Sequence, residues 1–241
     1  MASTFFISDV HLGTPQIKLE KEKEKRLLAF LDYVSTYGER LIIVGDLFDF
    51  WFEYRTVIPR GYTTILCALN QLKILGKDLH YVAGNHDFWM RDYMAREIGF
   101  QLHMDPISLT IRGKRFYINH GDGIARSDKG YRLLKRIFRN KINIFLYSLI
   151  HPDLGIPLAK WISGLSREHT YHHGNVDDRD YIQLAEQKFR EGYDYVVMGH
   201  LHVPNYQQIG HKVYVNLGDW MEHFTYAEFD GEHLHLRWWQ R

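Results

Sequence analysis

The chain has 241 residues, 45% of them hydrophobic and 24% charged, and its formal net charge is +1. A chain of this length and composition buries a sizeable core, and we expect one domain over residues 1–241. Its near-neutral charge gives no field that favours nucleic acid, so no nucleic-acid partner is expected. The single cysteine, Cys67, excludes an internal disulfide and suits a reducing compartment. We interpret it as a small core residue of a helix.

Membrane-spanning and export signals are lacking in the sequence pattern. No stretch reaches the roughly 20 apolar residues that cross a bilayer. The first residues lack the basic flank and apolar core of a secretory signal peptide. We therefore expect a soluble, cytoplasmic protein that can still contact a membrane surface, and no obligate protein partner is evident.

The first part of the chain alternates strands and helices. Apolar runs predict strands at residues 5–8, 41–44 and 79–83, and helical periodicity predicts helices at residues 18–36, 63–75 and 88–98. The first helix opens with alternating lysines and glutamates, which we interpret as a solvated face with ion pairs one turn apart. The alternation predicts a parallel sheet covered by helices.

Beyond Gly99 the pattern changes to shorter strands joined by glycine-containing turns. Strands are expected at residues 107–111, 114–118, 195–198, 205–209, 212–216, 224–229 and 233–239, with a charged helix at about 176–190. Turns such as Arg112-Gly113 are typical of antiparallel hairpins. Parallel and antiparallel strands together predict the α/β class, with two sheets flanked by helices.

Polar motifs follow five of the predicted strands. The central motif is Gly84-Asn85-His86-Asp87, and the others are Asp9-Val10-His11, Gly45-Asp46-Leu47-Phe48-Asp49, Asn119-His120-Gly121-Asp122 and Gly199-His200-Leu201-His202. Open α/β sheets bind ligands at the carboxyl ends of their strands. We therefore expect these side chains to line one site.

The motifs contain side chains with the chemistry of metal ligands: Asp9, His11, Asp46, Asn85, His120, His200 and His202. Carboxylate, amide and imidazole donors without a thiolate suit Mn, Fe or Zn. Seven donors exceed the needs of one ion, so we expect two divalent ions that share Asp46. Such a pair can clamp the attacking and leaving oxygens of a phosphoryl transfer.

The sequence has 15 histidines, so most of them are expected to be surface or hydrogen-bonded residues. We assign that ordinary role to the histidines outside the strand-end motifs: His80, His103, His151, His211, His233 and His235. The cluster of His169, His172 and His173 also lies outside the motifs, and its role stays open.

The five motifs, in this order, closely resemble the calcineurin-like metallophosphoesterase superfamily over residues 9–202. The resemblance implies a four-layer α/β/β/α sandwich with a dinuclear centre at the strand ends. It assigns Asp9, His11 and His202 to one metal and Asn85, His120 and His200 to the other. Asp46 bridges the two ions in this assignment.

The same resemblance implies roles beside the ligands. His86 would act on the phosphoryl or leaving-group oxygen, as a proton donor or as a stabiliser of negative charge. Asp49 is similar to the residue that orients this histidine, and Asp87 is expected to hold the turn.

Residues 125–170 differ from the rest of the chain, and we predict a helical cap inserted in the domain. The segment carries six cations from Lys129 to Lys141, followed by many apolar residues. A basic amphipathic helix followed by an apolar one is typical of a surface that meets anionic lipid. The alternative is a helical hairpin that buries its own apolar face.

Three segments resemble the UDP-2,3-diacylglucosamine hydrolases of bacterial lipid A synthesis: residues 120–132, 46–51 and 217–220. This resemblance implies hydrolysis of the substrate pyrophosphate to UMP and 2,3-diacylglucosamine 1-phosphate, with manganese as the usual ion. It implies a nucleotide-linked glycolipid as partner and a peripheral position on the cytoplasmic face of the bacterial inner membrane. The substrate contacts it suggests are Asn85, Asp128, Tyr131, Lys135, Arg136 and Arg167.

Position 86 departs from that pattern, because the best-known branch of these hydrolases carries arginine there. His86 makes the motif look like the general superfamily. Two alternatives stay open: a metallophosphoesterase of another phosphodiester, nucleotide or phosphoprotein, and a non-catalytic scaffold with the same fold. A scaffold is expected to lack ligands, and here each position of the pattern is filled.

Overall fold

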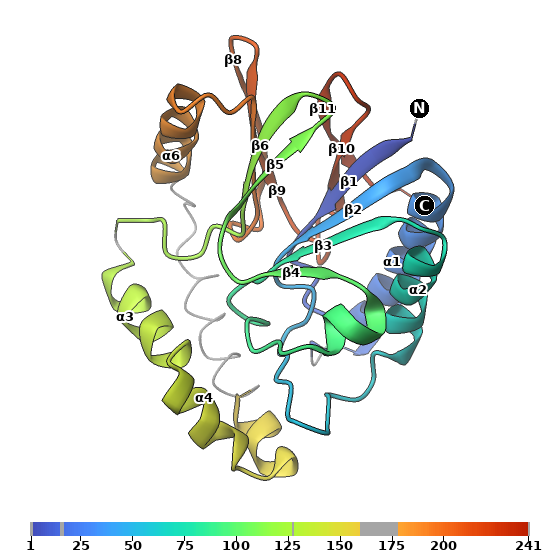
Figure 1. Cartoon of the computed structure of the whole chain (residues 1–241), viewed down its shortest axis with the longest axis vertical. Coiled ribbons are helices and arrows are strands. Elements are labelled where there is room, and N and C mark those ends of the chain that lie inside the picture. The colour runs from blue at the N-terminus through green and yellow to red at the C-terminus, as the bar shows by residue number, and fades with distance from the viewer. Residues whose placement is uncertain (1, 15–16, 127, 160–177, 241) are drawn as a thin grey trace.

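The computed structural model describes residues 2–14, 17–126, 128–159 and 178–240, and two β-sheets form its centre (Figure 1). The first sheet has the strand order β11 (Leu234–Trp238), β10 (Thr225–Phe229), β1 (Ser3–Ile7), β2 (Gly38–Val44), β3 (Asp78–Val82) and β4 (Gln101–His103). The second has the order β5 (Ile107–Ile111), β6 (Lys114–Asn119), β7 (Tyr195–Met198), β9 (Lys212–Leu217) and β8 (Pro204–Ile209).

The strand directions explain why the strand-end motifs meet. Strands β1 to β4 are parallel, β10 pairs antiparallel with β1, and the edge strand β11 pairs antiparallel with β10. Strands β6, β7 and β9 are parallel, with antiparallel β5 and β8 at the edges. Neighbouring parallel strands in register end together, so their carboxyl-terminal turns share one edge of each sheet. These two mixed sheets confirm the predicted α/β class.

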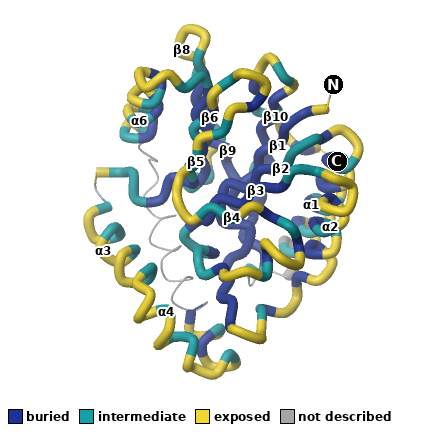
Figure 2. Tube along the Cα trace, viewed as in Figure 1, coloured by how far each residue is buried: buried dark blue, intermediate teal, exposed yellow. Residues whose placement is uncertain are grey.

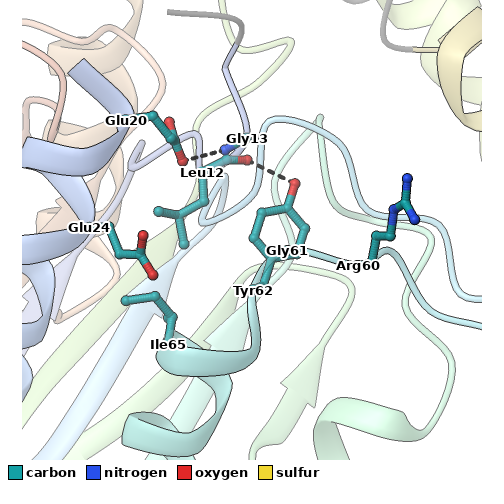
Figure 3. A pocket seen from close by; sticks show the side chains of 8 residues that line it. All are labelled: Leu12, Gly13, Glu20, Glu24, Arg60, Gly61, Tyr62 and Ile65. Carbon is teal, nitrogen blue, oxygen red and sulfur yellow. Dashed lines mark hydrogen bonds between the residues drawn. The ribbon is translucent and has the colours of Figure 1, made fainter. Parts of the chain in front are cut away.

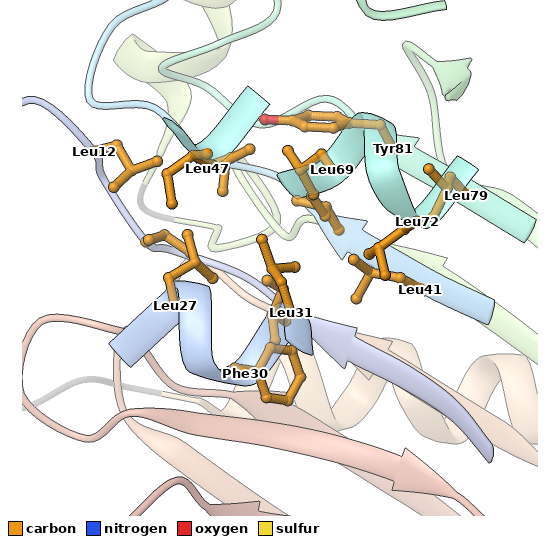
Figure 4. Packing of buried hydrophobic residues seen from close by; sticks show 14 of the residues in the cluster. Leu12, Leu27, Phe30, Leu31, Leu41, Leu47, Leu69, Leu72, Leu79 and Tyr81 are labelled. Atoms are coloured by element: carbon orange, nitrogen blue, oxygen red, sulfur yellow. The ribbon is translucent and has the colours of Figure 1, made fainter. Parts of the chain in front are cut away.

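Three hydrophobic cores hold the layers together. Phe6 of the first sheet stacks on Phe116 of the second, with ring centroids 5.7 Å apart, in the core between the sheets. The largest core lies between the first sheet and helices α1 (Ile17–Tyr37) and α2 (Thr63–Ile74), where leucines and aromatic rings interdigitate (Figure 4). Helix α6 (Arg179–Arg190) packs Tyr181 against Tyr214 on the other side of the second sheet. This order is consistent with an α/β/β/α sandwich, and Figure 2 shows inner strands such as β1, β3 and β9 as buried.

The predicted helix at residues 88–98 is wrong over most of its length. Only Met94–Ile98 is helical, as a short π-helix, and residues 101–103 form the unpredicted edge strand β4. The buried carboxylate of Glu53 accepts the backbone N–H groups of Arg91, Asp92 and Tyr93 at 2.8, 2.9 and 2.9 Å. These N–H groups are thereby capped by a distant side chain, which sequence periodicity does not reveal.

Two residue assignments are also corrected. Cys67 is exposed and not part of the core, because α2 buries Ile65, Leu66, Leu69 and Leu72 on its other face. Lys23 does not belong to a solvated face, because its side chain is fully buried in α1. The N-terminal residues expected for the helix at 176–190 lie outside the described residues, and the helix is described from Arg179.

Helices α3 (Lys129–Phe138) and α4 (Lys141–Ser148), with the helical residues 152–159, lie along one side of the sandwich, and we call them the outer helices (Figure 1). An aromatic cluster joins them to the sandwich. The ring of Tyr147 stacks on Trp89 at 5.6 Å and lies 4.5 Å from Phe52, and Trp89 Nε1 donates to the Phe138 carbonyl at 3.1 Å. Within the described residues, no helix combines the length and apolar character needed to cross a bilayer.

Candidate metal centre

The predicted ligands sit in turns with an unusual backbone. Asp9, His11, Asp46, His200 and His202 have φ values of 53°, 49°, 54°, 72° and 58°, in the left-handed region. Residues other than glycine rarely adopt this conformation, which costs about 1–3 kcal/mol and persists where the surroundings enforce it. Here the N–H of Asp9 donates to the Gly45 carbonyl at 3.1 Å, and that of His11 donates to the Asp46 carbonyl at 2.9 Å. The turns after β1 and β2 thus hold each other.

Two carboxylates organise the side chains of these turns. Asp9 Oδ1 lies 3.8 Å from His11 Nε2 and 3.6 Å from His202 Nε2. Asp46 Oδ2 lies 3.8 Å from His11 Nε2 and 3.3 Å from His120 Nε2. Asp46 therefore lies between the group around Asp9 and the group around His120, as expected for a shared ligand.

His120 has a fixed ring orientation. Its Nδ1 donates to the Val44 carbonyl at 2.8 Å, so Nε2 is the atom that faces the site. Nε2 lies 3.1 Å from Asn85 Oδ1. Burial lowers the pKa of His120, but the carboxylates of Asp46 and Asp9 outweigh burial and raise it to about 10. The oxygens around this imidazole therefore favour positive charge.

The unsatisfied atoms of the cluster test whether a metal would fit. Five buried atoms of proposed ligands make no hydrogen bond: Asp9 Oδ1, Asp46 Oδ2, His202 Nδ1 and both ring nitrogens of His11. Buried polar atoms in folded proteins nearly always have a partner, and leaving one unpaired costs about 1–3 kcal/mol. Burial raises the pKa of Asp46, but His120 and His86 hold it well below its usual value. Ionised carboxylates beside imidazoles suit a divalent cation, so the residues present fit the expected ions.

The structure brings most, but not all, of the predicted acidic and histidine ligands within 4.8 Å of one another. Three groups of acidic and histidine residues have ligand atoms within 4.8 Å of one another: Asp9, His11 and His202; His11, Asp46 and His86; and Asp9, Asp46 and His120. Within the described part of the chain, His200 belongs to none of these groups. The backbone N–H of His200 donates to Asp9 Oδ2 at 2.9 Å, and the His200 ring centroid lies 5.2 Å from that of His120. Burial, followed by the neighbouring His120, lowers the pKa of His200 to about 4.

His86 and Asp49 interact differently from the expectation. His86 Nδ1 donates to the main-chain carbonyl of Asp49 at 2.9 Å, whereas the Asp49 carboxylate lies 3.7 Å from His11 Nδ1. His86 Nε2 lies 4.0 Å from Asp46 Oδ2. Asp87 accepts the Gly84 N–H at 3.0 Å and the Tyr81 hydroxyl, and so holds the turn as expected.

Two glycines are required by close approach. A Cβ on Gly84 would lie 2.0 Å from Asp46 Oδ1, and one on Gly199 would lie 2.5 Å from Asp9 Oδ2. Real Cβ contacts are never this short, so a side chain at either position would displace a carboxylate of the centre. The glycines of the motifs therefore make room for the ligands.

Comparison with known proteins identifies the family of this chain. A profile of the calcineurin-like phosphoesterase family matches residues 3–204. The chain belongs to this family. A relative from Porphyromonas gingivalis (strain ATCC BAA-308 / W83), named UDP-2,3-diacylglucosamine hydrolase, is 35% identical over 96% of this chain and 95% of its own length. A relative of the same name from Nitrosococcus oceani is 28% identical over 90% of this chain and 87% of its own.

A solved structure supports the fold assignment of this phosphoesterase. The structure described as "Structural and Functional Characterization of a Novel Archaeal Phosphodiesterase" superimposes with a TM-score of 0.51, at 13% sequence identity, and covers 98% of this chain and 99% of its own. At this identity the similarity concerns the fold alone.

Sequence reasoning missed Asp219, a residue of the phosphoesterase that lies beside the predicted ligand His202. Asp219 Oδ2 lies 3.7 Å from His202 Nδ1, while its Oδ1 accepts the N–H groups of Met221, Glu222 and His223 at 3.1, 2.9 and 3.0 Å. Such partners fix the orientation of ligand imidazoles. In the sequence, residues 217–220 indicate only a family resemblance, and no role for Asp219 follows from it.

A cavity of about 440 Å³ opens between the centre and the outer helices. Asn85, His86, Tyr131 and Lys135 line it together with apolar side chains of α3, α4 and residue 158. Of the other predicted substrate contacts, Asp128 and Arg136 are not among the lining residues. Arg167 and the cluster of His169, His172 and His173 lie outside the described residues.

Replacing Asp46 by asparagine tests the centre. The substitution keeps the shape but removes the charge that both groups share, and we expect metal content to fall from about two ions per chain to less than one. Elemental analysis of purified protein measures it. Asp105→Asn, at an exposed position, is the matched control and should retain metal. Full occupancy in D46N contradicts a shared ligand.

Proposed function

We propose that this phosphoesterase hydrolyses the pyrophosphate bond of UDP-2,3-diacylglucosamine and releases UMP and 2,3-diacylglucosamine 1-phosphate. The observation that carries the proposal is the cavity of about 440 Å³, because it joins the candidate metal centre at Asn85 and His86 to a mainly apolar lining. Such a cavity suits a substrate with a phosphate at one end and acyl chains at the other. The relatives that match nearly the full chain are named as hydrolases of this compound.

The proposal includes two divalent ions, with Mn²⁺ favoured and Fe or Zn as alternatives. Asp9, His11 and His202 would hold one ion, and Asn85, His120 and His200 the other, with Asp46 shared. When bound, the ions supply Lewis acidity that activates water for attack on the α-phosphorus and neutralises charge on the phosphate oxygens. The filled ligand positions speak against the alternative of a non-catalytic scaffold.

His86 is proposed as the group that assists the leaving oxygen. The carbonyl of Asp49 holds the Nδ1–H, so the ring presents Nε2 toward Asp46 and the cavity. Burial lowers the pKa of His86, so a proton taken up at Nε2 makes a readily donating imidazolium that can protonate the leaving oxygen or stabilise its charge. Asp49 thus positions His86 through its main chain.

Substrate contacts are proposed on α3 and the turn before it. Tyr131 donates its hydroxyl to Asp122 Oδ2 at 2.8 Å, and Lys135 Nζ lies 2.6 Å from the same oxygen. Both side chains line the cavity near the centre, where a phosphate oxygen can compete with Asp122 for them. We retain Asp128, Arg136 and Arg167 as weaker candidates for phosphate contacts.

We propose that residues 125–170 form a cap that meets the cytoplasmic face of the inner membrane. The outer helices expose Leu133, Phe145, Leu149 and Leu154 by 61%, 61%, 67% and 69%. Contiguous exposed apolar side chains mark an interaction surface. Exposed cations flank them at Lys129, Arg136 and Lys141, and this combination suits anionic headgroups with acyl chains behind them better than a self-contained hairpin.

The substrate is tested by comparing two compounds. We expect the Mn²⁺-loaded protein to release UMP from UDP-2,3-diacylglucosamine, with kcat/KM well above that for a soluble aryl phosphodiester. Phosphorus NMR or chromatography of the products measures the reaction. Turnover of the aryl compound alone would reject the glycolipid and leave the alternative phosphodiesterase function.

His86→Ala should lower kcat by roughly 10²–10⁴-fold, the usual contribution of a positioned acid or base. Metal content should stay unchanged, because His86 is not a proposed ligand. Steady-state kinetics and elemental analysis separate the two effects. His211→Ala, in the exposed turn between β8 and β9, is the control. Unaltered kcat in H86A excludes the proposed role.

The membrane contact is tested by reversing the charge of Lys129, Arg136 and Lys141 to glutamate. Each cation near an anionic surface contributes about 1 kcal/mol, so binding to phosphatidylglycerol vesicles should weaken at least tenfold. Vesicle co-sedimentation measures the binding. Glutamates at the exposed Lys21, Lys25 and Lys73 make the same charge change elsewhere. Equal binding by the two triple variants contradicts the proposed surface.

A further inference from the structure

Lys23 occupies an unusual position in α1. Among the described residues it is the one lysine or arginine that is buried, with an exposed fraction of 0%. It precedes Leu27 by four residues, and Leu27, Phe30 and Val34 form the face of α1 that packs in the largest core. Burying an ammonium group is unfavourable unless the group is paired and hydrogen-bonded. The ammonium group of Lys23 therefore needs hydrogen-bond and ion-pair partners inside the protein.

The ammonium group of Lys23 contacts the turn that carries His11. Nζ donates to the main-chain carbonyl of His11 at 2.6 Å and to Thr14 Oγ1 at 3.5 Å. It also forms an ion pair with Glu20 Oε2 at 2.9 Å, one helical turn earlier. Lys23 thus contacts the backbone of a proposed metal ligand directly.

Glu20 completes a clamp on the same turn. Its Oε1 accepts the Gly13 N–H at 2.6 Å, and its Oε2 accepts the Thr14 hydroxyl at 3.0 Å. Figure 3 shows the bond between Glu20 and the Gly13 N–H, and beside it the Tyr62 hydroxyl donates to the Leu12 carbonyl at 3.2 Å. A small pocket of about 150 Å³ flanks Glu20, whose side chain is 22% exposed, whereas the lysine is enclosed. Two side chains of α1 and the side chain of Tyr62, the N-cap of α2, therefore hold residues 11–14.

This clamp matters because His11 is central and its backbone is strained. Its φ is 49°, and its Nε2 lies 3.8 Å from both Asp9 Oδ1 and Asp46 Oδ2. A left-handed residue without glycine's freedom relaxes unless its peptide groups are held. Rotation of the His11 peptide would move the imidazole away from both carboxylates at once.

We propose that Lys23, oriented by Glu20, is a positioning residue that fixes the His11 peptide and thereby holds the imidazole toward the metal centre. The proposal rests on the centre and not on the identity of the substrate. A purely structural ion pair would contribute to stability alone, whereas a positioning residue also changes the affinity of the folded protein for metal.

The test compares Lys23→Met with Lys25→Met, which makes the same change at an exposed site of the same helix. Calorimetric titration of metal-free protein with Mn²⁺ should show about tenfold weaker binding of one ion in K23M, a loss typical of residues that orient ligands. The melting temperature of the metal-free variants is measured in parallel. Mn²⁺ affinities equal to those of K25M, in a folded K23M, would overturn the proposal even if its melting temperature fell.

Glu20→Gln keeps an acceptor for the Gly13 N–H but removes the partner charge of Lys23. We expect a smaller decrease in Mn²⁺ affinity, about threefold, because the lysine keeps its bond to His11. If K23M does not fold, the Mn²⁺ affinity of E20Q is the test, and an affinity equal to that of the unsubstituted protein rejects the proposal. Because these titrations contain no substrate, a protein that binds Mn²⁺ but does not cleave UDP-2,3-diacylglucosamine would refute the proposed function alone.

Discussion

The Asp46 carboxylate is the interaction on which the candidate centre depends. One of its oxygens faces His11 and His120, and the other accepts the backbone N–H of His86 at 2.9 Å. That position requires a left-handed backbone at Asp46 and the missing Cβ of Gly84. The turns after β1, β2, β3 and β6 therefore form one unit, because each of them contacts this carboxylate directly or through a neighbour.

The charge of this unit explains its chemistry. Carboxylates and imidazoles are buried together, and several of their polar atoms have no hydrogen-bond partner. Burial raises the pKa of Asp9 and Asp46, yet the neighbouring histidines hold both below their ordinary values. Such an arrangement attracts positive charge to buried carboxylates, where a cation interacts more strongly than in water.

The outer helices are tied to the same turns. Tyr131, Lys135 and Arg139 follow one another at four-residue spacing, and therefore lie along one face of α3 and its C-cap. The first two contact Asp122, two residues after His120, and Arg139 Nη2 donates to the Gly84 carbonyl at 3.4 Å. Contacts of α3 and its C-cap thus reach both the turn that carries His120 and the turn that carries Asn85.

The sequence by itself determined the class of fold and supplied the candidate residues of the centre, because both depend on local patterns. Apolar runs ending in Asp, Asn or His identify strand ends, and parallel strands bring such ends together. Tertiary structure alone decided the contacts between distant segments. Glu53 caps backbone N–H groups within the helix expected at 88–98. The Asp49 carboxylate lies near His11, and Lys23 is buried against the turn of His11 and does not lie on the predicted solvated face. A side chain's partner depends on where another segment comes to lie. For Lys23, only its four-residue spacing from Leu27 hinted at the buried side.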